Sequence, residues 1–173
     1  MSKVNVLRIA IVLATAALLA AIFYSRQNPE PPLAPSSPAP DFSFDSNGRS
    51  ARLGDLRGHV VVLNFWATWC APCIVEMPSL ERLHRALKDK GVIVLAVSVD
   101  EDAEAYQRFV REKGLTFSTA RDPGQKIAAL YGTFKFPETF VIDRQGRVVR
   151  KIIGPLEWDQ PEVIDFLLAL ARE

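Results

Sequence analysis

The chain contains two cysteines, Cys70 and Cys73, which are separated by two residues in the order Cys-Ala-Pro-Cys. Two thiols at this spacing can exchange disulfides or bind a soft metal ion. The 173-residue sequence has no other cysteine, so it offers neither a framework of structural disulfides nor a four-cysteine zinc site. The pair must therefore carry its chemistry alone, and the elements that hold it decide which thiol attacks.

A strand is predicted before the pair and a helix after it. Residues Val60–Trp66 form a nearly continuous β-branched and aromatic run, as expected for a central strand buried on both faces. From residue 70 to residue 90 a helix is predicted, and Gly91 is well placed to end it. The apolar positions that recur at helical spacing are Val75, Leu80, Leu83 and Leu87.

This arrangement places Cys70 at the N-terminus of the helix. The free N–H groups and the positive dipole end at that position lower the pKa of a thiol, and the thiolate is the species that attacks a disulfide. Pro72 fits the first turn, where its missing N–H has no helical partner. We therefore predict that Cys70 is the nucleophile and that Cys73 resolves the mixed disulfide.

The rest of the domain alternates between strand and helix patterns, which predicts an α/β layer structure whose first units are parallel. The turn Asp143–Gly146 indicates a hairpin that adds an antiparallel edge. The expected order is strand, helix, strand, helix, helix, hairpin, helix. Beyond the first strand and helix the expected elements are a strand at 92–99, helices at 103–113 and 125–131, strands at 139–143 and 148–153, and a helix at 161–171.

The N-terminal part predicts a membrane anchor. Ile9–Tyr24 is uncharged over roughly 16 residues, at the short end of a bilayer span that snorkelling by Arg8 and Arg26 would complete. Lys3 and Arg8 precede the run, so the positive-inside tendency places the N-terminus in the cytoplasm. The alternative is a cleaved signal peptide, but its only small-x-small candidate, 14–16, falls inside the apolar run.

Three parts of the chain are expected in consequence. Residues 1–26 form a signal anchor or transmembrane helix, and 27–40 a proline-rich linker. Residues 41–173 form the folded domain, which begins with an entry hairpin around Ser46-Asn47-Gly48. The 21 Lys and Arg residues nearly balance 20 Asp and Glu residues without a basic run, which disfavours nucleic acid as a partner.

The segment Phe65-Trp66-Ala67-Thr68-Trp69-Cys70-Ala71-Pro72-Cys73 resembles the active site of the thioredoxin fold. Pro78 matches that fold's helix kink, and Pro137 resembles its cis-proline, against which an extended substrate lies. The anchor, the Pro-Glu-Thr-Phe segment at 137–140 and Glu76 are similar, more narrowly, to the TlpA/ResA family over about residues 40 to 170. The resemblance implies a thioredoxin-like fold with a central mixed sheet flanked by helices.

The resemblance also implies a function. Proteins of this kind are extracytoplasmic reductants, anchored in the inner membrane with the domain on the periplasmic side. They receive electrons from a membrane thiol transporter and reduce disulfides of clients such as apocytochrome c. No cofactor beyond the Cys70–Cys73 disulfide and no metal ion is then required.

Further site residues are expected around the pair. Glu76 resembles the acidic residue that tunes cysteine reactivity in this subfamily, and we hypothesise that it assists proton transfer at Cys73; a solvated first-turn acid is the equal alternative. Asn64 stands where ordinary thioredoxins have a buried aspartate, and an amide cannot accept a proton as a carboxylate does. Trp69, Phe136 and Pro137 are the candidate substrate-binding residues.

Two other activities remain open as alternatives. A copper-handling chaperone would bind metal through the cysteine pair and a distant histidine, but His59 and His84 are both poorly placed. A disulfide-donating oxidase would use the same motif, since the direction of electron flow depends on small differences in thiolate stabilisation. A peroxidase is disfavoured because Ala67 stands where the peroxiredoxin pattern needs threonine.

Overall fold

The computed structural model describes residues 13–15, 18–19, 36–46 and 48–173. The chain divides into two compact units, Met1–Pro32 and Leu33–Glu173, and the fold and the cysteine pair belong to the second. Most of the predicted anchor lies outside the described residues, as does the linker up to residue 35. Within the described residues, no helix has the length and apolar character needed to cross a bilayer.

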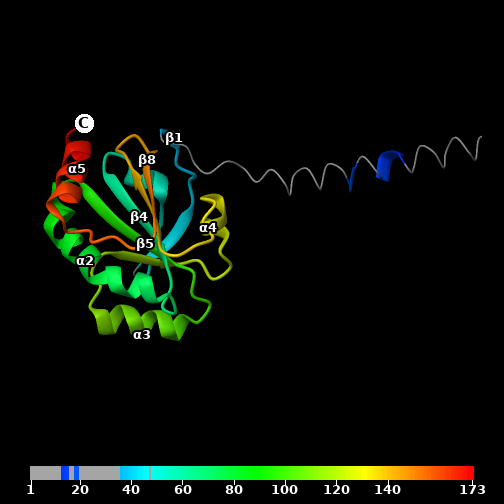
Figure 1. Cartoon of the computed structure of the whole chain (residues 1–173), viewed down its shortest axis with the longest axis horizontal. Coiled ribbons are helices and arrows are strands. Elements are labelled where there is room, and N and C mark those ends of the chain that lie inside the picture. Colours follow the sequence, from blue (N-terminus) through cyan, green and yellow to red (C-terminus); the bar gives the residue numbers. More distant parts are fainter. Residues whose placement is uncertain (1–12, 16–17, 20–35, 47) are drawn as a thin grey trace, which may run out of the picture. The chain divides into compact units, whose positions relative to one another are not determined.

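A six-stranded mixed sheet forms the centre of the second unit, with the strand order β1-β8-β7-β4-β5-β6 (Figure 1). β5 is parallel to both β4 and β6, whereas β7 is antiparallel to β4 and β8, and β8 to β1. The strands are β1 (Ser37–Pro38), β4 (Val60–Trp66), β5 (Val92–Ser98), β6 (Ser118–Arg121), β7 (Glu138–Ile142) and β8 (Arg147–Ile153). A separate hairpin consists of β2 (Ser43–Ser46) and β3 (Arg49–Arg52).

All seven residues of β4 are buried, because this strand lies in the middle of the sheet and both of its faces are covered. Successive side chains of a strand point to opposite faces, so β4 reports which elements cover each face. Trp66 contacts Tyr106 and Phe109 of α3 (Ala103–Lys113) on the face that Asn64 shares with α2 (Ala71–Leu87). On the other face, the ring of Phe65 packs on Tyr131, directly after α4 (Lys126–Leu130).

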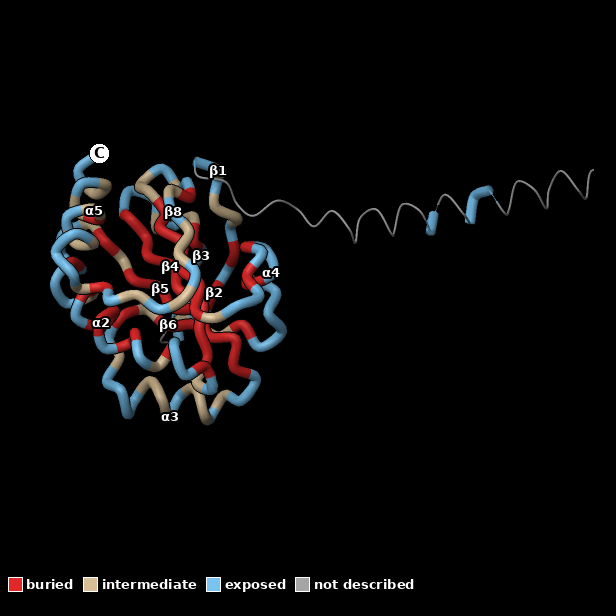
Figure 2. The backbone as a smooth tube through the Cα atoms, in the orientation of Figure 1, coloured by how far each residue is buried: buried red, intermediate tan, exposed pale blue. Residues whose placement is uncertain are grey.

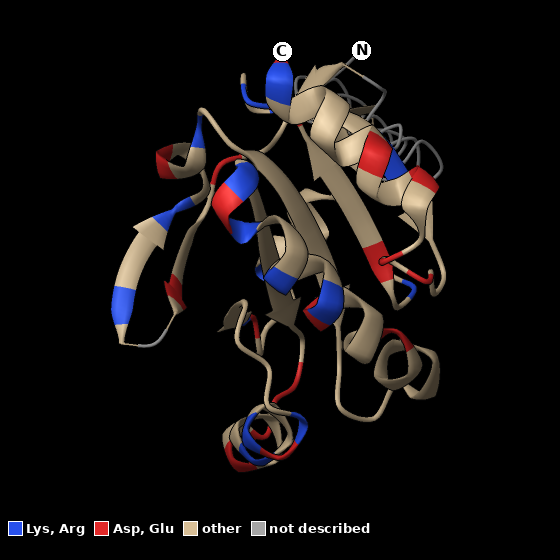
Figure 3. Ribbon diagram, turned by 90° about the vertical axis from the view of Figure 1, so that its left-hand side faces the viewer, with Lys and Arg blue, Asp and Glu red and all other residues tan. Residues whose placement is uncertain are grey.

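The right-handed crossovers β4–α2–β5 and β5–α3–β6 explain why α2 and α3 lie on the same face. The C-terminal helix α5 (Pro161–Arg172) contacts β4 and β5. In Figure 2 the buried residues run as a continuous band through the central strands. Figure 3 shows Lys and Arg interspersed with Asp and Glu over the ribbon, while the central strands carry few charges.

The predicted α/β architecture with a mixed sheet is confirmed, and so is the entry hairpin. The helix after the cysteine pair, α2, ends at Leu87, and the short 3-10 helix η2 (Lys88–Lys90) that follows it is capped by Gly91, whose φ of 80° is a left-handed conformation that glycine adopts without strain. The turn at 143–146 joins β7 to β8 as expected, with Gly146 also at a φ of 80°.

Three details of the prediction were wrong. β6 lies between α3 and α4, where no strand was expected, because its sequence Ser-Thr-Ala-Arg has no apolar run. The sheet begins before residue 41, since β1 comes from the end of the predicted linker; its Pro38 is tolerated because β1 is an edge strand. Val75 is 73% exposed instead of facing the core, and Met77 is fully buried on α2.

Candidate active site

The two cysteines form a disulfide with an S–S distance of 2.03 Å and a Cα–Cα distance of 5.3 Å. Cys70 is the N-cap residue of α2, and its sulfur accepts a hydrogen bond from the backbone N–H of Cys73 at 3.3 Å. Pro72 lies in the first turn, where no backbone donor is missed. A thiolate at Cys70 would therefore face free N–H groups of the helix, as the sequence predicted.

The two cysteines differ in accessibility. Cys70 retains 6% of its surface, whereas Cys73 is fully buried beneath it. An incoming thiol or disulfide can therefore reach Cys70 and not Cys73. This difference supports the assigned roles of nucleophile and resolving residue, because attack requires contact along the S–S axis.

Glu76 is buried on the same helix, with 1% of its surface exposed. The alternative that it is a solvated first-turn acid is therefore wrong. Its Oε1 accepts from Asn64 Nδ2 at 2.8 Å, and its Oε2 accepts from Leu156 N and Trp158 Nε1, each at 3.1 Å. Burial raises the pKa of Glu76, and the three hydrogen bonds offset part of this rise.

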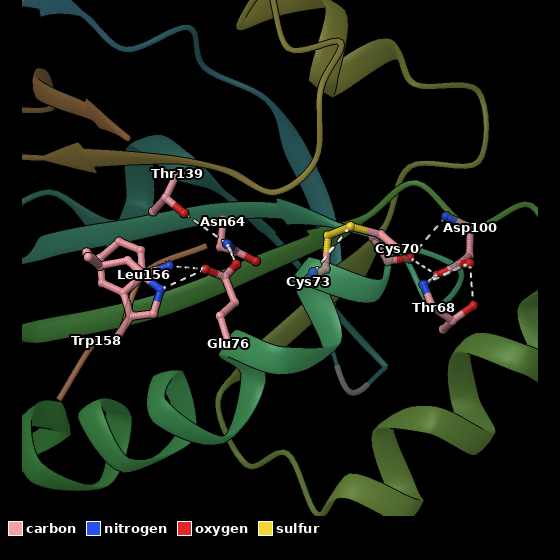
Figure 4. Close-up of a disulfide and its surroundings, with 10 residues drawn as sticks. Asn64, Thr68, Cys70, Cys73, Glu76, Asp100, Thr139, Leu156 and Trp158 are labelled. Carbon is pink, nitrogen blue, oxygen red and sulfur yellow. Dashed lines mark hydrogen bonds between the residues drawn. A yellow bond between two sulfur atoms is a disulfide. The ribbon is translucent and has the colours of Figure 1, made fainter. Parts of the chain in front are cut away.

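Asn64 lies between Glu76 and Cys73 (Figure 4). Its amide donates to Glu76 and also to Thr139 Oγ1 at 2.9 Å, across the β4–β7 pair in which the two residues are directly opposed. These two donated bonds leave Asn64 Oδ1 buried without a partner among the described residues. No hydrogen bond joins Glu76 to Cys73 directly, and Asn64 is the polar side chain that lies between them.

Trp158 was not predicted as a site residue. It lies in the loop between β8 and α5, is 1% exposed, and reaches Glu76 from the side of this residue that faces away from the cysteines. Ser79 Oγ accepts from the backbone N of Trp158 at 3.1 Å, and Arg82 binds Glu157 and Asp159 at 2.6 and 2.5 Å. No periodic pattern in the sequence marks this loop, so only the folded structure identifies Trp158 as a hydrogen-bond donor to Glu76.

The predicted substrate-binding residues lie together beside the disulfide. Trp69 is 65% exposed, and its ring contacts Phe136 edge-on at a centroid distance of 6.0 Å. The peptide bond between Phe136 and Pro137 is cis, as the resemblance implied. By contrast, Trp66 is fully buried against α3. Trp69 is thus the tryptophan of the motif that a bound protein can touch.

The two histidines lie away from this group. His59 precedes β4 at the end opposite the cysteines. His84 lies on α2, its ring packs edge-on against Phe117, and burial lowers its pKa. Neither residue contributes to the site.

A helix-capping disulfide after a buried central strand, with a cis-proline directly before the neighbouring strand β7, defines the class of thioredoxin-fold thiol-disulfide oxidoreductases. The chain belongs to the AhpC/TSA family, whose model matches residues 35–151. It is 45% identical over 125 residues to the thiol-disulfide oxidoreductase ResA of Bacillus thuringiensis, with 72% of each chain covered. The identity to ResA of Bacillus subtilis is 36% over 121 residues, covering 69% of this chain and 68% of that one.

A solved structure supports the same class. The crystal structure of a Chlorobium tepidum protein assigned as the thiol:disulfide interchange protein DsbE superposes with a TM-score of 0.75 at 32% identity. The superposition covers 80% of this chain and 99% of that one. The chain is therefore a thiol-disulfide oxidoreductase of the ResA and DsbE type.

Proposed function

We propose that the protein is an extracytoplasmic reductant of client disulfides, for example in apocytochrome c, and that its electrons come from a membrane thiol transporter. The observation that carries this proposal is that Cys70, the cysteine of the pair that keeps some exposed surface, lies at a helix N-terminus directly after Trp69, whose exposed ring contacts the half-buried Phe136. The ResA relatives support the class of reaction.

The reaction passes two electrons from the reduced cysteine pair to the client. The Cys70 thiolate attacks one client sulfur, the client S–S bond breaks, and the other client sulfur leaves and takes a proton. Cys73 then loses its proton and attacks Cys70, which releases the second client thiol and forms the Cys70–Cys73 disulfide. No cofactor beyond the disulfide is needed for this exchange.

Glu76 is the proposed acceptor of the proton that Cys73 loses. Its burial raises the pKa of this carboxyl group towards the range in which it can hold a proton, and Asn64 links it to the Cys73 side of the site. Trp69, Phe136 and Pro137 would contact an extended client segment, with the two aromatic rings supplying apolar surface around the target disulfide.

The reduction potential of the domain tests the direction of transfer. We expect residues 33–173, equilibrated with a dithiothreitol or glutathione buffer, to show a two-electron couple well below the roughly −180 mV of protein disulfide isomerase. Cys70→Ser is the control and should lose the couple. A value near the −120 mV of a strong oxidant would instead indicate disulfide donation, and the absence of a reversible couple would favour the copper-handling alternative.

The membrane anchor is the part of the proposal carried by sequence alone. Full-length protein is expected to remain in the membrane fraction after alkaline extraction, and its measured mass should be that of the chain with its N-terminal segment uncleaved. Leu18→Lys with Leu19→Lys should release it, because a lysine at the centre of a span costs about 2.5 to 3.5 kcal/mol. A soluble protein shortened within the first 30 or so residues would show a cleaved signal peptide instead.

A further inference from the structure

A second buried carboxylate lies near the disulfide and has no part in the chemistry above. Asp100 lies two residues beyond the end of β5 and is 2% exposed. Its oxygens accept from the backbone N of Thr68 at 2.9 and 3.2 Å, from Thr68 Oγ1 at 2.7 Å and from Ser98 Oγ at 2.6 Å. Every one of these partners is a donor, which is the environment that fits an ionised carboxylate.

These bonds hold Asp100 against the loop that carries the nucleophile. Thr68 lies two residues before Cys70, whose own N–H donates to Ala67 O at 3.2 Å. The strand before this loop is tied to the same end of β5, since Val99 N donates to Trp66 O at 2.9 Å. Figure 4 shows Asp100 and Thr68 on the Cys70 side of the disulfide, with Glu76 and Asn64 on the Cys73 side.

The carboxylate of Asp100 forms no ion pair within the described part of the chain. The guanidinium of Arg121 donates to the backbone carbonyls of Asp100 and Glu101, at 3.4 and 2.8 Å, and not to the Asp100 carboxylate. Tyr106 faces the same region from α3. A buried charge that is compensated only by neutral donors is weakly screened by solvent and acts on neighbouring groups.

We propose that Asp100 is a positioning residue whose buried negative charge, fixed beside the Cys70 loop by Thr68 and Ser98, disfavours the Cys70 thiolate and keeps the disulfide the preferred state of the pair. A like charge destabilises a thiolate. A reduced form that is less stable gives the cysteine pair a lower reduction potential, whereas a stabilised reduced form makes a strong oxidant. This deepens the proposed function, on which it rests for the roles of the two cysteines.

Neutralisation of Asp100 in the full-length protein tests the proposal. For Asp100→Asn we expect the equilibrium with dithiothreitol to shift towards the reduced protein by about tenfold, which corresponds to ~30 mV for a two-electron couple. The pKa of the Cys70 thiol, followed by thiolate absorbance in the reduced protein, should fall in parallel. Asp100→Ser is smaller and also neutral, so it provides the same measurement if the asparagine variant does not fold.

Asp100→Glu is the matched control, because it keeps the charge and should leave the equilibrium constant within about threefold of the unchanged protein. A purely structural role would weaken the oxidised and reduced forms equally and would leave the potential unmoved. The proposal is overturned if both neutral variants stay within threefold, or if Asp100→Glu shifts as far as they do. All values are read relative to the unchanged protein, so this outcome is independent of whether its absolute potential is that of a reductant or an oxidant.

Discussion

Cys70→Ser is expected to abolish catalysed disulfide exchange, whereas Cys73→Ser is expected to keep the first step and to accumulate a mixed disulfide with the client. The reason is the difference in accessibility, since Cys70, the N-cap of α2, keeps 6% of its surface exposed and Cys73 is fully buried. Without a nucleophile the reaction falls to its uncatalysed background, a loss of at least ~10³-fold. Without the resolving thiol, the first bond forms and is not broken.

The measurement is reduction of a disulfide-bonded peptide by each reduced variant, with adducts detected by mass after alkylation. Cys73→Ser should yield one adduct of protein plus one peptide half, attached at Cys70, and Cys70→Ser should yield none. Serine is smaller than cysteine and fits both positions, so near-native unfolding midpoints serve as the check on folding. An adduct at Cys73 in the Cys70→Ser variant would reverse the assigned roles.

The strands of the sheet could be predicted from the sequence wherever burial on both faces requires a long run of apolar residues. β4 and β5 are long runs of apolar residues because both of their faces are covered, and α3 shows its apolar stripe in Tyr106, Phe109 and Val110. β6 could not be predicted, because a four-residue strand held by its pairing with β5 needs no apolar run. β1 has only two residues, one of them a proline, and only its pairing with β8 makes it a strand.

The helix after the cysteines shows that one residue was assigned to the wrong helix face. Val75 is predicted on the apolar face with Leu80, Leu83 and Leu87, yet it is exposed while Met77 is buried. Val75 lies five residues before Leu80, which puts it on another side of the helix, whereas Met77 lies three residues before Leu80 and shares its face. The helical period therefore agrees with the observed burial once Met77 takes the place of Val75 in the stripe.

The site itself was predictable in its covalent part and not in its polar surroundings. Cys70, Cys73 and the candidate substrate-binding residues can be selected from local sequence, because the motif and the cis-proline segment are each contiguous. The hydrogen-bond donors to Glu76 come from β4 and from the loop after β8, and one of them, Trp158, is 82 residues away in sequence. Asp100 was missed for the same reason, since its contacts with Thr68 span 32 residues. Such contacts exist only once the sheet has formed.

Glu76→Gln is expected to slow release of the client from the mixed disulfide by about 10²-fold near neutral pH, the usual contribution of a positioned acid or base. The first attack by Cys70 should change little, so the two steps separate in stopped-flow measurements. Glutamine keeps the shape of the side chain: its oxygen can accept from Leu156 N and Trp158 Nε1. Its amide can donate to Asn64 Oδ1, now without a partner, if the Asn64 amide rotates. If Glu76→Gln and the unchanged protein have equal rates in the second step, Glu76 does not have the proposed role.

The stability of the oxidised protein gives an independent result for the same substitution. Because burial raises the folded-state pKa of Glu76 above its ordinary 4.5, the folded chain binds more protons than the unfolded chain between these two values. The corresponding stability is complete below the unfolded pKa and is lost as the pH rises through the folded one. Glu76→Gln should therefore gain unfolding free energy relative to the unchanged protein as the pH rises through this window, measured by urea titration.

Glu81 on the same helix provides the matched control with the opposite sign. Burial raises the pKa of Glu81, but the hydrogen bonds from Thr116 and Arg85 outweigh this effect and lower it overall. Its contribution to stability is present above the ordinary pKa of 4.5 and is lost as the pH falls through the lowered value. Glu81→Gln should thus lose unfolding free energy relative to the unchanged protein as the pH rises, where Glu76→Gln gains it. Parallel curves for the two variants would show that the buried carboxyl group of Glu76 does not titrate as its surroundings require.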